Sequence, residues 1–155
     1  MSIVPPKTEY LMTMHALLDN PRQIDATLMV FNVREGGWIR GPQIEGRLVS
    51  PGGDWARLMP AGNLRLDVRA TAETSDGGLL QLTYNGVISF DEPTLGRFMA
   101  GEKLVTSDCY FFTAPLVQTN SQRYAWLNHV QCVGRMVEMQ LGENPHVVYD
   151  VFVLR

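Results

Sequence analysis

Residues 64–90 read LRLDVRATAETSDGGLLQLTYNGVISF, and their pattern is the clearest indication of the fold class. Residues 64–74 alternate strictly between apolar and polar side chains, as in a strand with one buried face. Asp76-Gly77-Gly78 follows, and Asp-Gly and Gly-Gly pairs tolerate the positive φ angles of a tight hairpin turn. Residues 79–90 then form a second, largely apolar strand. The stretch therefore predicts an antiparallel β-hairpin.

Outward from this hairpin, period-two patterns continue along the chain. Glu35-Gly36-Gly37 and Ser50-Pro51-Gly52-Gly53 have the composition of turns between strands. One short helix is predicted after Phe90, because Asp91 suits its N-cap, Pro93 suits its first turn, and Leu95 and Phe98 have helical spacing. The other predicted strands are Tyr10–Leu18, Ala26–Val33, Ile44–Val49, Ala56–Met59, Tyr110–Thr113, Tyr124–Val133, Met136–Leu141 and Val147–Leu154.

This order of elements predicts an all-β fold. Many strands with short connections form either a sandwich or a barrel, and a succession of hairpins favours the barrel, in which no strand edge stays unpaired. We expect one domain over residues 1–155, a single antiparallel β-barrel, lipocalin-like in outline, with about eight to ten strands and one short helix. A barrel of this size has room for one small ligand.

Composition and charge exclude several kinds of partner. The net charge is −3 and the 13 Lys and Arg residues are scattered, so the sequence predicts no nucleic-acid partner. No apolar run approaches ~20 residues, so we expect no membrane partner. Residues 1–7 lack the basic-then-apolar order of a signal peptide. Cys109 and Cys132 lie in apolar segments, which fits reduced, buried thiols and a cytoplasmic location.

The sequence also predicts neither a metal site nor a cofactor. His15, His129 and His146 show no ligand spacing with one another or with carboxylates. No serine lies in a Gly-x-Ser-x-Gly elbow, which argues against a serine hydrolase.

A set of motifs in a fixed order resembles the DUF3237 family of small, uncharacterised proteins. The resemblance covers nearly the whole chain and implies an antiparallel barrel, assembly into a homo-oligomer, and no firmly assigned family activity. It rests on Gly41-Pro42 with Gly46, residues 51–55, Asp67 with Arg69, Asp76-Gly77, Gly86, residues 112–115, Thr119, residues 124–128 and residues 148–151.

Four groups of residues are candidates for a site, each with a purely structural alternative. Asp54 and Trp55 follow a Pro-Gly-Gly turn that can direct both side chains into the barrel. In the structural alternative, Asp54 makes a local hydrogen bond in the turn and Trp55 fills one end of the core. Asp67 and Arg69 share one strand face. If that face is internal, Asp67 is a candidate base and Arg69 a candidate anion binder; if it is external, they form a solvated ion pair worth little free energy.

The aromatic candidates are Tyr84 and a predicted strand face that carries Tyr124, Trp126 and Asn128. An aromatic wall with an amide at its end suits a flat ligand with a carbonyl or hydroxyl group, but an ordinary aromatic core has the same composition. We expect Asp54, Asp67 and Arg69 as catalytic residues and Trp55, Tyr84, Trp126 and Asn128 as ligand-binding residues, all around one pocket.

Two hypotheses for the function follow. In the first, the barrel binds a carbonyl-bearing or aromatic metabolite and catalyses cofactor-independent acid-base chemistry, such as isomerisation, cyclisation or elimination. In the second, it is a non-catalytic carrier or a structural barrel that binds a hydrophobic metabolite. The orientation of Asp67, Arg69, Tyr84 and Trp126 relative to one cavity separates the two.

Overall fold

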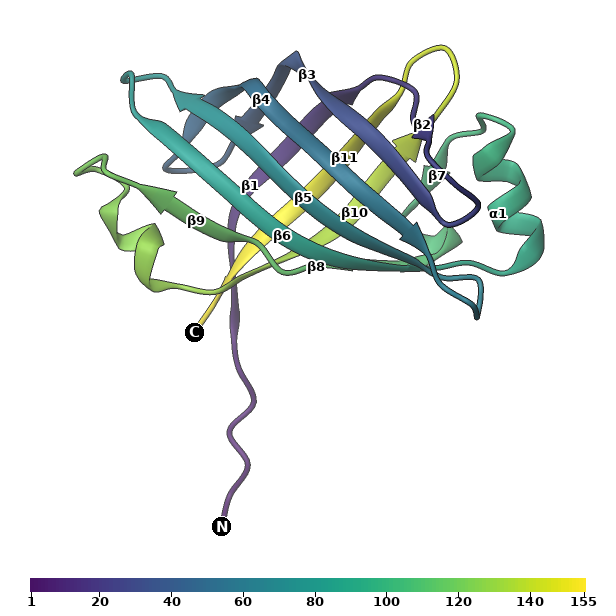
Figure 1. Cartoon of the computed structure of the whole chain (residues 1–155). Coiled ribbons are helices and arrows are strands. Elements are labelled where there is room, and N and C mark those ends of the chain that lie inside the picture. Colours follow the sequence, from purple (N-terminus) through teal and green to yellow (C-terminus); the bar gives the residue numbers. More distant parts are fainter.

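The structure is a computed structural model that describes residues 1–155, and its strands close into a barrel (Figure 1). Eight strands follow one another in the order β1-β11-β10-β8-β6-β5-β4-β3, and β3 pairs with β1 to close the ring. All pairings are antiparallel. The strands are β1 (Thr8–Leu18), β2 (Arg22–Gln23), β3 (Leu28–Arg40), β4 (Glu45–Leu58), β5 (Leu64–Thr74), β6 (Leu79–Ser89), β7 (Leu104–Val105), β8 (Tyr110–Thr113), β9 (Leu116–Thr119), β10 (Cys132–Gln140) and β11 (His146–Leu154).

The predicted all-β barrel is confirmed, and the hairpin at its centre is β5–β6. Gly77 has φ +85° at the turn, the left-handed region that glycine enters without strain. The apolar face of β5 points into the core, and Leu66, Val68 and Ala70 are buried there. The polar face of the same strand lies outside, because side chains alternate across a strand.

The single α-helix, α1 (Glu92–Met99), lies beside one end of the barrel, while β9 lies toward the other end (Figure 1). The predicted N-cap is present: the Thr94 backbone N–H donates to Asp91 Oδ1 over 2.8 Å. Phe98 is buried and stacks on Phe90 with 5.5 Å between ring centroids. No helix is both long and apolar enough to cross a membrane.

Two predicted turns are wrong, because long bent strands run through them. β3 continues through Glu35-Gly36-Gly37, where a Cβ on Gly37 would lie 2.3 Å from the His15 backbone oxygen of β1. β4 likewise continues through residues 50–53, where its register against β5 shifts between Val49 and Gly53. In both places glycine serves a bulge or a close approach between strands, rather than a chain reversal.

The predicted strand Tyr124–Val133 is also wrong over most of its length. Residues Ala125–His129 form the short 3-10 helix η2, and the strand begins only at Cys132. A second 3-10 turn, η1 (Thr106–Asp108), precedes β8. Tyr124, Trp126 and Asn128 therefore do not lie in a row on a sheet face, since a 3-10 turn rotates successive side chains by about a third of a turn.

Candidate functional site

The interior of the barrel holds one acid among apolar and aromatic side chains. Asp54 on β4 pairs with Val68 on β5, and Val68 pairs with Tyr84 on β6. The three residues therefore lie in one row across three neighbouring strands. Asp54, Val68 and Tyr84 all line the same internal cavity, so all three side chains are on the inner face.

Tyr149 on β11 approaches this row from the opposite wall of the barrel. Its ring meets that of Tyr84 edge to face, with 5.9 Å between centroids, and meets that of Phe111 in the same way at 5.5 Å. Both tyrosines are almost fully buried. Two phenol rings and one phenyl ring thus surround the space next to the Asp54 carboxylate.

The carboxyl group of Asp54 is in an unusual environment for an acid. Burial raises its pKa to about 7, a hydrogen bond from the Asp67 backbone N–H opposes the rise, and the Asp67 charge adds to it. That hydrogen bond reaches Oδ1 over 3.2 Å, and no protein group donates to Oδ2. Oδ2 is therefore free to interact with a molecule in the cavity, and near neutral pH the group exchanges its proton readily.

The two phenols stay protonated under ordinary conditions. Burial raises the pKa of Tyr84, and the nearby Asp54 charge raises it further. Burial also raises the pKa of Tyr149, with additional contributions from Tyr84 and Asp54. Each therefore provides a neutral hydroxyl, which can donate a hydrogen bond to a ligand oxygen.

The cavity itself is small and apolar. Its free volume is about 50 Å³, and 16 of its 19 lining residues are hydrophobic. That volume holds a few water molecules, so a metabolite enters only when the surrounding side chains move. Leu18, Ile88 and Leu141, which lie near the ends of their strands, line the cavity together with Phe98 of α1, so α1 covers this end of it.

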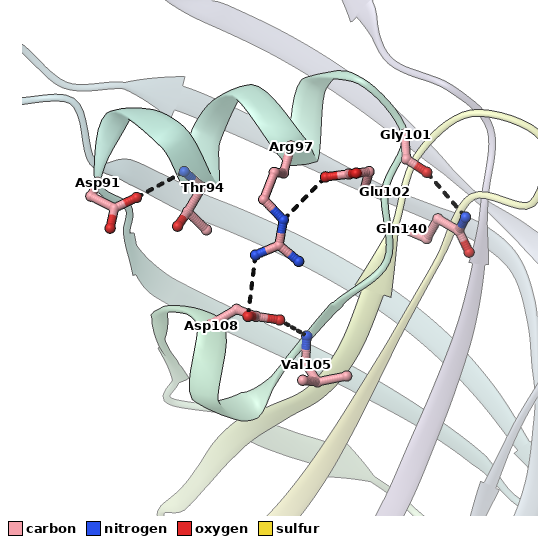
Figure 2. A network of polar contacts seen from close by, with 8 residues as sticks. All are labelled: Asp91, Thr94, Arg97, Gly101, Glu102, Val105, Asp108 and Gln140. Carbon is pink, nitrogen blue, oxygen red and sulfur yellow. Dashed lines mark hydrogen bonds and ion pairs between the residues drawn. The ribbon is translucent and has the colours of Figure 1, made fainter.

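The segment that covers this end has an internal network of polar contacts (Figure 2). The Arg97 guanidinium donates to Glu102 at 3.1 Å and to Asp108 at 3.3 Å, and both partners lie in the same excursion between β6 and β8. A side-chain contact to the barrel comes from Gln140, whose Nε2 donates to the Gly101 carbonyl over 3.0 Å. The segment is also tied to the barrel wall, because β7 pairs with β10 and Thr106 Oγ1 donates to the Met136 carbonyl over 2.9 Å.

The structure divides the seven predicted site residues among different places, so the prediction of one shared pocket is wrong. Asp54 and Tyr84 are inside. Asp67 and Arg69 are on the outer face, with side chains 48% and 57% exposed and 3.9 Å between Oδ1 and Nη1. The external alternative for this pair is therefore correct, because the apolar face of β5 fills the core.

The remaining three residues also lie outside the cavity. Trp55 is 41% exposed on the outer face of β4, since it is adjacent to the inward-facing Asp54. Trp126 packs outside the barrel core, with the Arg155 guanidinium 5.7 Å from its ring. Asn128 is structural: its Nδ2 donates to the carbonyls of Thr119 and Ala125, and its Oδ1 accepts from the Thr119 N–H.

Sequence reasoning did not single out Tyr149 as a site residue. A signal was present, because Val147, Tyr149, Val151 and Val153 alternate with more exposed residues along β11 and are all buried. A polar aromatic residue in such a row has its hydroxyl inside the barrel. The alternation alone does not predict that Tyr149 lies opposite Tyr84, because that position depends on closure of the barrel.

The family model DUF3237, whose description is a protein of unknown function, matches residues 6–154. The chain belongs to the DUF3237 family. Among curated relatives, this DUF3237 protein is 28% identical over 105 residues to a UPF0311 protein of Clostridium acetobutylicum and 27% identical over 99 residues to one of Rhodopseudomonas palustris. The aligned segments span 66% and 65% of those relatives, just under two thirds of their length.

Solved structures share the barrel of this DUF3237 protein. A conserved protein of unknown function from Rhodopseudomonas palustris has a TM-score of 0.90 at 22% identity, covering 99% of this chain and 100% of that one. A beta-barrel like protein from Acinetobacter baumannii has a TM-score of 0.76 at 25% identity, with 99% of both chains covered. These likenesses establish the fold.

One further relative of this DUF3237 protein has a named activity. The hydroalkoxylation enzyme phnH of Penicillium herquei is 27% identical over 135 residues, which are 84% of this chain and 74% of that protein. A solved structure of an enzyme from Penicillium herquei has a TM-score of 0.69 at 20% identity, covering 100% of this chain and 98% of that one.

Proposed function

We propose that this protein is a cofactor-independent acid-base enzyme that acts on a small, mostly apolar metabolite inside the barrel. One observation carries the proposal: the Asp54 carboxyl group, with a pKa of about 7, lies in an apolar cavity beside two neutral phenols. A carboxylic acid that is half protonated near neutral pH serves equally well as proton donor and as proton acceptor.

The reaction class that suits this arrangement is the addition of a hydroxyl group across a carbon–carbon double bond within one molecule. Neutral Asp54 donates its proton to one alkene carbon, and the substrate hydroxyl oxygen bonds to the other carbon. The hydroxyl proton then passes to the Asp54 carboxylate, which restores the acid, so no atom or charge is left over. The faces of Tyr84, Phe111 and Tyr149 stabilise positive charge that develops on the substrate.

The named activity of the Penicillium herquei relative, hydroalkoxylation, belongs to this reaction class. At 27% identity the relative supports the class of chemistry rather than the substrate. The apolar lining independently favours a substrate with few polar groups, because an unpaired polar group in such a cavity loses its hydration without compensation.

A specific observation also favours a second candidate, a non-catalytic carrier. The cavity wall is overwhelmingly hydrophobic, which by itself binds an apolar molecule without any proton transfer. The two candidates differ in what Asp54 does: an enzyme needs its ionisation, whereas a carrier tolerates an amide of the same shape.

The test uses a simple phenol with an alkenyl arm, 2-(3-methylbut-2-enyl)phenol, whose ring closure gives 2,2-dimethylchroman with the same mass. We expect the wild-type protein to accelerate this closure, measured by chromatography against authentic product. Asp54→Asn keeps the side-chain shape and removes the proton donor, so the rate should fall by roughly 10²–10⁴-fold.

Glu73→Gln is the matched control, since Glu73 is a carboxylate on the outer face of β5, paired with Arg47. It should leave the rate unchanged. Equal rates for wild type and Asp54→Asn would refute the acid-base role. Binding of the phenol without turnover by any variant, with equal affinity for wild type and Asp54→Asn, would favour the carrier instead.

A further inference from the structure

Two arginines face each other on the outside of the barrel without an ion-pair partner, and Asp25 is an acid that interacts with Arg57 at longer range. Arg57 on β4 and Arg65 on β5 are directly opposite in the register of the two strands, and both are exposed. Neither forms an ion pair with any acidic residue of the chain, whereas Arg34, Arg47 and Arg69 each do. Like charges directly opposite on a sheet are destabilising, so an anion between them is favoured.

These arginines form one side of a groove on the outer face of the sheet. The groove extends over β4, β5, β6 and β8, and its free volume is about 600 Å³. Trp55 borders it next to the arginines, and Tyr110, which is 58% exposed, borders it on the far side. Three strand spacings separate these borders, about 14 Å. The floor between them carries Asn85 and Val87 of β6, so the groove presents a surface for a flat molecule of two or three rings.

The charge of the groove has the opposite sign from that of the whole protein. The chain carries −3 overall, yet the groove lining contains Arg57, Arg65 and a single acid, Asp67. The Asp67 carboxylate is 3.9 Å from the Arg69 guanidinium and is therefore already neutralised in part. Arg135 adds further positive charge, since its guanidinium is 5.5 Å from the ring of Phe112 in the groove wall.

We propose that this groove is a second binding site, for a planar aromatic molecule that carries a carboxylate or phosphate group. The anionic group binds between Arg57 and Arg65, whose planar guanidinium groups match the geometry of both anions. The aromatic part lies against Trp55 and Tyr110. The site is separate from the acid-base cavity, because it lies on the opposite face of β4 and β5 from Asp54.

The test is a titration of the ¹⁵N-labelled full chain with 2-naphthoate, followed by nuclear magnetic resonance. We expect the indole N–H of Trp55 and the amide of Gly86 to shift, and the affinity to fall as salt is added. The uncharged analogue 2-naphthamide should bind at least about tenfold more weakly, since it lacks the charge-assisted hydrogen bonds. A parallel titration with 2-naphthyl phosphate distinguishes a carboxylate site from a phosphate site.

Substitutions then locate the anion. Arg57→Gln and Arg65→Gln should each weaken 2-naphthoate by about tenfold. Arg47→Gln is the control, because Arg47 is also exposed on β4 but pairs with Glu73 outside the groove. Three outcomes would each overturn the proposal. The first is an unchanged affinity for 2-naphthoate in both groove variants. The others are larger shifts with the peptide acetyl-tetraglutamate amide than with either naphthyl anion, and shifts of the groove signals when the protein alone is concentrated. The last two would assign the groove to a protein partner or to a second copy.

Discussion

The backbone N–H of Asp67 donates a 3.2 Å hydrogen bond to Oδ1 of Asp54, although the two side chains lie on opposite faces of the sheet. Adjacent strands bring the two residues together, and strand alternation separates their carboxylates. One acid is consequently buried with a raised pKa, while the other is exposed beside Arg69. The structure thereby distinguishes two aspartates that are equivalent candidates in the sequence.

Replacing Asp54 by asparagine should change how stability depends on pH. Because burial raises the pKa of Asp54 to about 7, the folded protein binds a proton at this residue more tightly than the unfolded chain does. Its contribution to stability is complete below the unfolded pKa near 4 and is lost as the pH rises through about 7. Asp54→Asn should therefore gain stability relative to wild type between pH 4.5 and pH 8, on the order of 2 kcal/mol, measured by urea unfolding. A constant difference across this range would contradict the raised pKa.

Replacing Asp67 by asparagine should lower the pKa of Asp54. The Asp67 charge is one of the causes that raise this pKa, after burial, and an amide removes it while the backbone hydrogen bond remains. A ¹³C titration of the side-chain carboxyl groups measures the change directly. Activity should persist with its pH profile displaced to lower pH. Loss of activity at every pH would instead make Asp67 the acid.

The pair of His146 and Glu138 should stabilise the barrel end at neutral pH. His146 Nε2 lies 2.7 Å from Glu138 Oε2, and its Nδ1 lies 2.6 Å from the Asn144 carbonyl, which can only accept a hydrogen bond. The hydrogen bond from His146 lowers the pKa of Glu138. This contribution is present above the unfolded pKa of about 4.3 and is lost as the pH falls through the lower folded value.

Glu138→Gln should therefore cost about 1–3 kcal/mol at pH 7, because His146 is buried and would lose its charged partner. The cost should shrink toward pH 3, because acid brings wild-type Glu138 closer to its own protonation. Thermal unfolding at both pH values checks this, with Glu143→Gln as the exposed control. An equal cost at the two pH values would mean that packing, rather than ionisation, is responsible.

Truncating Phe98 should open the barrel end beside α1. Phe98 is buried, lines the cavity and stacks on Phe90, whereas the ties of this segment to β10 are made after α1, by β7 and by Gly101 and Thr106. Phe98→Ala should lower stability by up to about 3 kcal/mol and accelerate amide hydrogen exchange in residues 91–108. Met99→Ala is the control, since Met99 is 54% exposed on the same helix. If amide hydrogen exchange in Phe98→Ala were as slow as in wild type, contacts other than those of Phe98 would hold this segment in place.

Local structure in this protein can be predicted from short stretches of its sequence. Alternation over residues 64–74 and the Asp76-Gly77 turn defined the β5–β6 hairpin, and Asp91 defined the start of α1. These features depend on backbone conformation and on neighbours in sequence, so they are encoded within a few residues. The same alternation also placed an apolar and a polar face on β5 without deciding which one lines the interior.

The grouping of residues into a site, in contrast, depends on how the strands assemble. The sequence pattern predicts two short strands, 44–49 and 56–59, with Asp54 in the loop between them. In the structure the register shift between Val49 and Gly53 lets β4 bend without ending, so Asp54 lies within the strand and faces the cavity. Closure of β3 onto β1 makes the sheet a ring, and the ring brings Tyr149 to Tyr84 from the opposite wall. Such contacts join residues far apart in the chain, and their geometry arises from closure and register rather than from any local pattern.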